Sequence, residues 1–327
     1  MAVSAAVRRV IITTESAQRA RREIEEIEGI EVVARYELTH ERDPVALARE
    51  LAGAWATIAG SEPYTGAVLQ ATPTLKAILR WGTGSDAIDI AAATEAGVAV
   101  VTTPGVNAEA VADMALTLML ACIRRLPALD EAVRNANWHR EGPTRDLAGA
   151  TVGVVGLGAV GRAVTRRLRA FGCRVLALEP YPDEDFCAQY EVELSDLEAM
   201  LPQVDVLTLH APLGPASKRL IGTEELAALP NHAVLINTAR GELVDQAALV
   251  QALHEGQMAA AGLDVFEHEP VPPDDPILRA PNTIFSGHIS SYTELGLDRT
   301  RDALVDNLRE VLAGRLPPSC LNPDAWS

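Results

Sequence analysis

The N-terminal third of the chain alternates between short apolar runs and longer charged stretches. The apolar runs occur at 8–14, 30–36, 55–60, 75–81 and 98–103, reading RRVIITT, IEVVARY, WATIAG, LKAILRW and VAVVTT. Between them lie segments with helical periodicity, such as SAQRARREIEEI at 16–27 and DPVALARELA at 43–52. Strands that alternate with helices in this way predict a parallel sheet with crossover helices.

The rest of the chain repeats this alternation after a long apolar helix. Residues 107–125 predict that helix, and the polar stretch 126–149 predicts a connection. From Thr151 onward there are six further strand-like runs, reading TVGVV, CRVLAL, VDVLTLH, HAVLINT, MAAAGLDV and NTIFSG. Six strands with intervening helices are typical of a complete dinucleotide-binding sheet.

A glycine-rich turn follows the first strand of this second set. Gly156, Gly158 and Gly161 have the spacing G-x-G-x-x-G, and Glu179 ends the next strand. The first glycine permits a sharp turn, the second leaves room for a pyrophosphate, and the third lets the following helix pack close to the sheet with its amides facing the phosphates. A carboxylate at Glu179 would accept the ribose hydroxyls of NAD and repel a 2′-phosphate, and no cation follows in PYPDED. We predict NAD as the cofactor; the alternative is a glycine-rich turn such as any α/β protein contains.

The last helical segment decides how we divide the chain. Residues 293–313 follow a sheet that needs no further helix, so we expect this helix to return to the first domain. The prediction is an α/β protein of two Rossmann-like, doubly wound parallel-sheet domains, with the cofactor domain inserted into a discontinuous substrate domain. The flavodoxin-like substrate domain comprises 1–102 and 290–327, and the NAD-binding domain comprises 103–289. We expect the active site in the cleft between the two domains.

Composition and charge narrow the partners. The chain has 327 residues, of which 48% are hydrophobic, and a net charge of −17. This length accommodates two domains with sizeable cores, and the negative charge disfavours nucleic acid and anionic membranes as partners. The four cysteines form no C-x-x-C pair, the longest apolar stretch is too short to span a bilayer, and the N-terminus shows no signal-peptide pattern. These features predict a cytoplasmic protein with reduced thiols.

Three polar residues lie at strand ends of the second domain, where open α/β sheets bind ligands. Arg240 follows VLINTA, Glu269 ends LDVFEHE, and His288 follows TIFSG. A guanidinium binds a carboxylate in bidentate fashion, an imidazole transfers protons near neutral pH, and a nearby carboxylate orients the imidazole and favours its charged form. With NAD, these groups predict hydride transfer between a 2-hydroxy acid and a 2-oxo acid. Taken singly, each residue is as typical of a solvated or structural position as of an active site. The combination of the three favours an active site.

The motifs, taken in order, resemble those of the D-isomer-specific 2-hydroxyacid dehydrogenases. The resemblance extends over nearly the whole chain and includes RWGTGSDAID at 80–89, TTPGVNAEAVAD at 102–113, VGLGAVGRAV at 155–164, LHAPL at 209–213, INTARGELVD at 236–245, GLDVFEHEP at 262–270 and SGHISSYT at 286–293. Among these, INTARG and LDVFExEP are highly specific when they follow the glycine motif.

The resemblance implies a role for each matching residue. Arg240 binds the substrate carboxylate and keto group, His288 donates the proton in reduction, and Glu269 is its carboxylate partner. Backbone amides at Thr83 and Gly84 hold the substrate carboxylate. The expected cofactor contacts are Gly156, Gly158, Ala159, Val160, Gly161, Glu179, His210, Ala211, Pro212, Thr238, Ala239, Arg240, Asp264 and His288. Asp264 would meet the nicotinamide carboxamide; the alternative is a structural carboxylate at a strand end. The histidines show no metal-ligand spacing, so no metal is expected.

The family resemblance also implies a homodimer formed through the cofactor domain, with residues 126–147 as a contact region. The loop AGSEPYT at 59–65 lacks the basic residue associated with phosphoglycerate-using members, which argues against a phosphorylated substrate. We therefore predict an NAD-dependent dehydrogenase that interconverts a small D-2-hydroxy acid and a 2-oxo acid. The alternatives are an NAD(H)-sensing, corepressor-like binding protein and a formate- or phosphite-type dehydrogenase.

Overall fold

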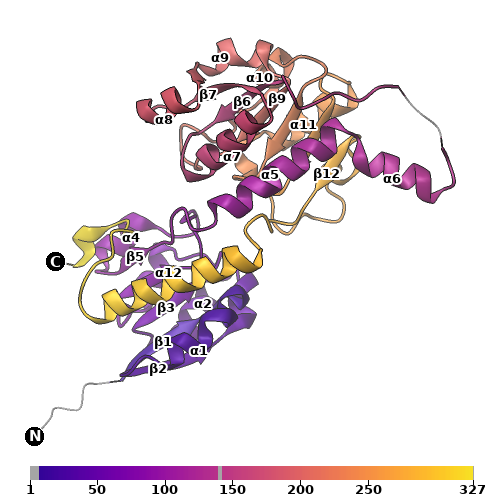
Figure 1. Ribbon diagram of the computed structural model, residues 1–327. Coiled ribbons are helices and arrows are strands. Elements are labelled where there is room, and N and C mark those ends of the chain that lie inside the picture. Colours follow the sequence, from indigo (N-terminus) through magenta and orange to yellow (C-terminus); the bar gives the residue numbers. More distant parts are fainter. Residues whose placement is uncertain (1–6, 139–141, 327) are drawn as a thin grey trace, which may run out of the picture. The chain divides into compact units, whose positions relative to one another are not determined.

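The computed structural model describes residues 7–138 and 142–326, and the chain forms two compact units (Figure 1). Unit 1 comprises Met1–Asn107 and Thr293–Ser327, and unit 2 comprises Ala108–Tyr292. Each unit contains one parallel sheet with helices on both faces, which confirms the predicted α/β fold class. The assignment of substrate binding to the first unit and cofactor binding to the second stays a prediction.

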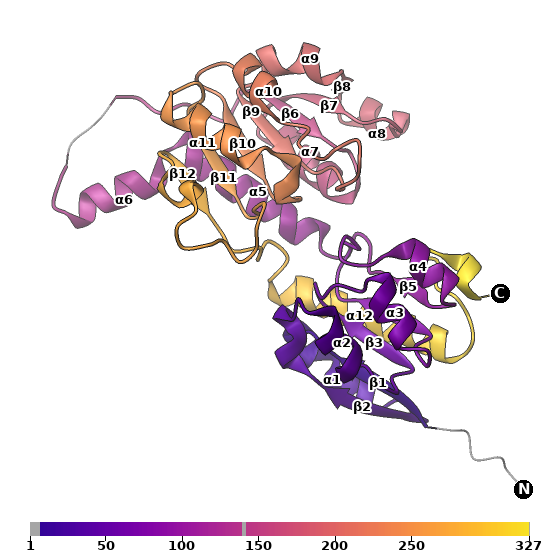
Figure 2. The same cartoon turned by 180° about the vertical axis from the view of Figure 1, so that it is seen from behind.

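Unit 1 contains a sheet of five parallel strands, all of which the apolar runs predicted. They are β1 (Arg8–Ile12), β2 (Ile30–Ala34), β3 (Ala56–Ala59), β4 (Ala77–Arg80) and β5 (Ala99–Val101), in the order β2-β1-β3-β4-β5. One face packs against η1 (Glu15–Ala20), α1 (Arg21–Glu25) and α12 (Glu294–Leu312), and the other against α2 (Pro44–Glu50), α3 (Gly66–Ala71) and α4 (Ile90–Glu95) (Figure 2). This is the strand order of flavodoxin-like sheets, in which the carboxyl ends of the strands carry the ligand site.

Unit 2 contains seven parallel strands, one more than the sequence predicted. They are β6 (Thr151–Val155), β7 (Arg174–Leu178), β8 (Val192–Leu194), β9 (Val206–Leu209), β10 (Val234–Asn237), β11 (Ala260–Leu263) and β12 (Thr283–Phe285), in the order β12-β11-β10-β9-β6-β7-β8. The additional strand is β8, an edge strand whose Glu193 and Leu194 are exposed, so it leaves no apolar run to recognise. The order reverses between β6 and β9, as in dinucleotide-binding sheets.

Helices cover both faces of the unit 2 sheet. The first face packs against α5 (Ala108–Ile123), α7 (Ala159–Ala170) and α8 (Glu184–Gln189). The second face packs against α9 (Leu197–Met200), η3 (Leu201–Gln203), α10 (Thr223–Ala228), α11 (Gln246–His254) and η5 (Pro276–Arg279). Helix α5 lies close to the sheet at Gly262. A Cβ on this glycine would lie only 2.9 Å from the Leu118 Cβ, so the close packing requires glycine there.

The polar stretch after α5, for which the sequence predicts a connection, contains a helix. Helix α6 (Leu126–Arg134) begins with Pro127 in its first turn, where the missing N–H costs nothing. None of its residues is buried, and its short apolar stripe of Leu126, Leu129 and Val133 lies in an otherwise polar stretch that is typical of a connection. In the described part of the chain, no helix combines the length and apolar character needed to cross a bilayer.

All four cysteines are free thiols. Cys122, Cys173 and Cys187 belong to the core of unit 2, and the Cys173 thiol donates to the Leu147 carbonyl at 3.2 Å. Cys320 is half-buried in unit 1. The three buried thiols are therefore part of the packed core of unit 2.

Candidate active site

The glycine turn after β6 has the close approaches that its spacing predicts. Gly156 has φ +94°, and a Cβ there would lie 2.8 Å from the Ala211 backbone nitrogen. A Cβ on Gly161 would lie 1.9 Å from the Gly156 carbonyl oxygen, which no rearrangement of side chains could relieve. Gly158 is exposed, and a Cβ there would meet nothing within 4 Å. The turn is thus packed tightly on its inner side and open at Gly158, as a pyrophosphate requires.

The start of α7 and the end of β7 complete this cradle. No side chain caps α7 at Gly158, so the positive end of the helix faces outward beside exposed Ala159 and half-buried Val160. Glu179 Oε2 accepts from the Leu157 backbone N–H at 2.8 Å, and Oε1 accepts from the Tyr181 N–H at 3.1 Å. A carboxylate has about four lone-pair sites, so Glu179 retains capacity for ribose hydroxyls.

Two buried polar atoms without partners lie at the carboxyl ends of neighbouring strands β9 and β10. His210 Nε2 is 2.9 Å from the Thr208 hydroxyl, whereas His210 Nδ1 and the Thr238 hydroxyl have no hydrogen-bond partner in the described structure. Burial lowers the pKa of His210 to about 3, so this imidazole is neutral at physiological pH. Buried polar groups are normally hydrogen-bonded. Atoms unpaired at this edge fit a cofactor that supplies the missing partners.

Glu269 follows β11 and His288 follows β12. Their side chains form a titratable pair that faces solvent. His288 Nδ1 lies 2.6 Å from Glu269 Oε2, and Glu269 Oε1 accepts from the Phe266 N–H at 3.0 Å. The His288 side chain is 50% exposed. Burial opposes ionisation of Glu269, but the hydrogen bond and charge of His288 outweigh it and lower the pKa of that carboxyl. The pair holds Nδ1 and leaves Nε2 to meet a substrate.

Asp264 anchors the loop that carries His288. Its carboxylate is fully buried and accepts from the Ser286 hydroxyl at 2.6 Å, the Ile289 N–H at 3.0 Å, and the Ser290 N–H and hydroxyl at 3.1 and 2.5 Å. Its carbonyl accepts from the His288 N–H at 2.7 Å. His288 has φ +55°, a strained backbone conformation that these bonds hold in place. The hydrogen bonds show that Asp264 supports the His288 loop; its contact with the nicotinamide carboxamide stays a prediction.

Arg240 follows β10 on a segment packed against the loop that leads to Glu269. Asn237 Nδ2 donates to the Arg240 carbonyl at 2.8 Å, and an Arg240 guanidinium nitrogen donates to the Ala239 carbonyl at 2.6 Å. A Cβ on Gly241 would lie 1.9 Å from the Phe266 carbonyl carbon, so the two segments touch backbone to backbone. The Arg240 charge is among the groups that lower the pKa of Glu269. The structure therefore brings Arg240, Glu269 and His288 to one edge of the unit 2 sheet.

Thr83 and Gly84 belong to unit 1, in the loop after β4. Thr83 is exposed and Gly84 half-buried. Among the described residues, their backbone N–H groups donate no hydrogen bond. Neighbouring N–H groups that point to solvent are a ready site for an anion such as a carboxylate.

The sequence profile for the NAD-binding domain of D-isomer specific 2-hydroxyacid dehydrogenases matches residues 116–290, more than half of the chain. The chain belongs to this family. It is an enzyme of the family, and the matched domain binds NAD. This match confirms the family resemblance that the sequence motifs indicate.

Relatives within the family differ in substrate and in length. The glyoxylate reductase of Korarchaeum cryptofilum is 38% identical over 269 residues, which are 81% of either chain. The D-3-phosphoglycerate dehydrogenase of Methanocaldococcus jannaschii is 37% identical over 257 residues, covering 78% of this chain but only 49% of that one. The NADPH-dependent glyoxylate/hydroxypyruvate reductase of Sinorhizobium meliloti, solved with NADP and malonate, has a TM-score of 0.85 at 30% identity over 98% of both chains.

Sequence reasoning missed the supporting residues of the site. Three such residues are Ser286, Ser290 and Gly241. The two serine hydroxyls donate to Asp264, and Gly241 leaves room for the Phe266 backbone. Small polar residues and glycines are common near strand ends, so only the folded arrangement distinguishes these three. The signal available was their position within the motifs that carry Arg240 and His288.

Proposed function

We propose that the protein catalyses the NADH-dependent reduction of a small 2-oxo acid to a D-2-hydroxy acid, and the reverse oxidation. The observation that carries this proposal is the 2.6 Å pair of His288 and Glu269 beside Arg240 at the carboxyl edge of a dinucleotide-binding sheet. That edge is where such sheets bind their cofactor, so an acid/base and a carboxylate-binding cation lie where the reduction would occur.

The residues that would hold NAD fit it chemically. Gly156, Gly158 and Gly161, with the start of α7, would receive the pyrophosphate, and Glu179 the adenosine ribose. The unpaired atoms of His210 and Thr238 would form hydrogen bonds with the nicotinamide half of NAD. Ala211, Pro212 and Ala239 would contact the same half. When bound, the nicotinamide supplies the hydride that the reduction needs.

The protein's own groups would hold the substrate and move the proton. Arg240 and the N–H groups of Thr83 and Gly84 would bind the substrate carboxylate. His288 Nε2 would donate a proton to the substrate oxygen while Glu269 stabilises the imidazolium through Nδ1. Asp264 would support this chemistry through the loop that it anchors and would meet the nicotinamide carboxamide.

The substrate class follows from the relatives and from the loop after β3. Two of the relatives reduce glyoxylate by name, and the loop 59–65 has no basic residue of its own. Arg42, from a neighbouring loop, donates to the Ser61 carbonyl and hydroxyl at 3.1 and 3.3 Å. A phosphorylated 2-oxo acid therefore belongs among the compounds tested.

The test follows NADH and NADPH oxidation by the purified protein with glyoxylate, pyruvate, hydroxypyruvate and hydroxypyruvate phosphate. We expect turnover of an unphosphorylated acid, with NADH preferred because Glu179 repels a 2′-phosphate. Turnover of hydroxypyruvate phosphate alone would overturn the substrate class. Tight NADH binding without turnover of any acid would overturn the reductase and favour a sensor.

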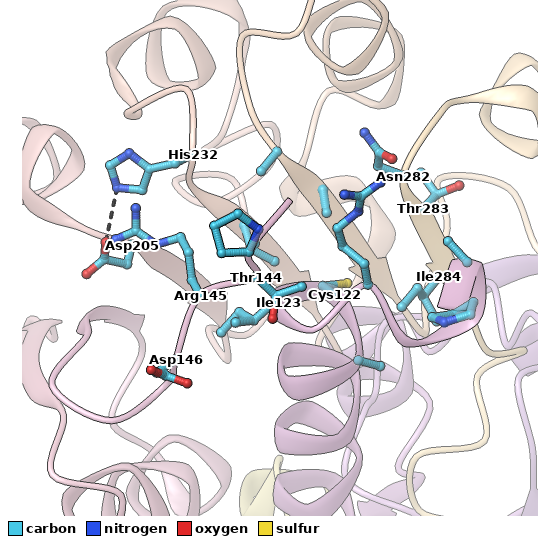
Figure 3. A pocket seen from close by; sticks show the side chains of 18 of the residues that line it. Cys122, Ile123, Thr144, Arg145, Asp146, Asp205, His232, Asn282, Thr283 and Ile284 are labelled. Atoms are coloured by element: carbon cyan, nitrogen blue, oxygen red, sulfur yellow. Dashed lines mark hydrogen bonds and ion pairs between the residues drawn. The ribbon is translucent and has the colours of Figure 1, made fainter. Parts of the chain in front are cut away.

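We also propose that the protein is a cytoplasmic homodimer formed through unit 2. Leu126, Leu129 and Val133 on α6 are 58%, 44% and 54% exposed, and Trp138 is 80% exposed. Beside α6 lies a cavity of about 420 Å³ between α5 and the amino ends of β9, β10, β11 and β12. Figure 3 shows Cys122, Ile123 and Ile284 in its wall and the His232–Asp205 pair at one end. Residues 139–141 of the expected contact region 126–147 lie outside the described residues.

An exposed apolar helix face beside a cavity with a partly apolar wall suits a two-fold interface, since each copy can place its helix against the same region of the other. We expect light scattering after gel filtration to give a dimer mass for the wild type and a monomer for Leu129→Glu combined with Val133→Glu. Val45→Glu is the matched control, because Val45 is an apolar residue 76% exposed on α2 of unit 1. A dimer mass for the double variant, or a monomeric wild type, would contradict this arrangement.

A further inference from the structure

Thr103, directly after β5, holds the loop that follows β4 by three hydrogen bonds. Its N–H donates to the Gly82 carbonyl at 3.0 Å, its hydroxyl oxygen accepts from the Gly82 N–H at 3.1 Å, and its carbonyl accepts from the Thr83 hydroxyl at 3.3 Å. The Thr103 side chain is buried, with 1% of the residue exposed. Both backbone polar groups of Gly82 are therefore bound to a single residue.

The loop is fixed from the β3 side as well. The Trp81 N–H donates to the Ala59 carbonyl at 2.9 Å, and the Arg80 guanidinium donates to the Trp81 carbonyl. Gly82 turns the chain at φ +124°, a conformation that L side chains rarely adopt. The backbone N–H groups are thus paired at Trp81 and Gly82, while those of Thr83 and Gly84 donate no bond within the described structure.

We propose that Thr103 is a positioning residue for the substrate, acting through this loop; the proposal rests on the proposed function, in which Thr83 and Gly84 bind the substrate carboxylate. Because the Gly82 N–H donates to Thr103, it is not available to the substrate. The three bonds of Thr103 also fix the directions of the backbone N–H groups of Thr83 and Gly84. Reactivity depends steeply on placement, because an error of about 1 Å can cost about a hundredfold in rate. A residue without substrate contact can therefore control the fit of the substrate.

Thr103→Val isolates the hydroxyl. Valine has nearly the same shape and keeps the backbone bonds of residue 103, but leaves the Gly82 N–H without its acceptor. Thr103→Ser restores an acceptor at that atom. Thr102→Val is the matched control, because Thr102 is also buried, at 2% exposed, and its hydroxyl donates to the Ser319 carbonyl at 3.5 Å rather than to the loop.

We expect Thr103→Val to raise the KM for the 2-oxo acid about tenfold, with the NADH Kd from fluorescence titration and the melting temperature close to those of Thr102→Val. Thr103→Ser should recover most of the wild-type KM. An unchanged KM in Thr103→Val, in an otherwise active enzyme, would overturn the positioning role and leave the proposed function standing. A change in KM that Thr102→Val reproduces would also overturn it, since it would reflect general loosening of unit 1. If the wild type reduces no 2-oxo acid, the proposed function fails first.

Discussion

Replacing His288 by alanine is expected to lower kcat for reduction by about 10²–10⁴-fold, the usual contribution of a positioned general acid. His288 is half-exposed and makes one side-chain bond, to Glu269, so its removal leaves the fold intact. The Kd for NADH, measured by fluorescence titration, should change little because the glycine turn and Glu179 remain. Turnover at the wild-type level would remove His288 from the mechanism.

Glu269→Gln is the comparison that keeps the imidazole and removes the charge behind it. His288 lowers the pKa of Glu269, so this carboxyl is ionised in the neutral range and the substitution removes a negative charge beside His288 Nδ1. That charge would stabilise the proton donor of the reduction, so kcat/KM for reduction should fall. Steady-state kinetics across the neutral pH range measures this, and a wild-type kcat/KM would contradict the coupling.

Gly241→Ala is expected to destabilise the protein by about 3 kcal/mol, the upper end of what overpacking usually costs. The new Cβ would lie 1.9 Å from the Phe266 carbonyl carbon, 2.0 Å from its oxygen and 2.5 Å from the Glu267 nitrogen. Backbone atoms cannot rotate away, so Arg240 and the Glu269 loop must separate. Urea unfolding should show the loss of stability, and reductase activity should be nearly abolished. Wild-type stability would show that the two segments are not in contact.

Gly158→Ala is the matched control: we expect it to leave the stability unchanged and to weaken NADH binding. A Cβ at residue 158 meets nothing within 4 Å, so the free energy of unfolding should stay within about 0.5 kcal/mol of the wild type. The same methyl group projects into the space proposed for the pyrophosphate, so NADH affinity should fall. Two alanine substitutions at glycines thus separate a packing requirement from a ligand requirement.

Periodicity along the chain was sufficient to predict the two sheets. TVGVV coincides with β6, and the apolar runs ending near Asn237, Leu263 and Phe285 are β10, β11 and β12. Strands β6, β10 and β11 are buried on both faces and β12 is partly buried at the edge, which gives apolar runs that end where the chain emerges. The position of Arg240, Glu269 and His288 at one edge of the sheet could be predicted for the same reason, because a polar side chain after such a run lies where the strand ends; their roles stay predictions.

Elements that bury little, and contacts between distant segments, could not be predicted in this way. Strand β8 lacks an apolar run because two of its three residues face solvent, and helix α6 has only a short apolar stripe, Leu126, Leu129 and Val133, in a polar stretch. The contact of Asp264 with the nicotinamide carboxamide stays a prediction, but the bonds that its oxygens accept come from residues more than twenty positions away along the chain. Nothing local in GLDVF specifies those partners. The bonds of Thr103 to Gly82 are of the same long-range kind.

The burial of three cysteines in the core of unit 2 has a practical consequence for solution studies. Burial raises the pKa of Cys122 to about 12 and that of Cys173 to about 11, and it also raises the pKa of Cys187. Alkylating reagents attack the thiolate, which burial disfavours at all three residues while the protein is folded. Cys320 is the more accessible thiol, and it belongs to unit 1. A maleimide dye should therefore attach at one defined place in the native enzyme without any cysteine being engineered in or out.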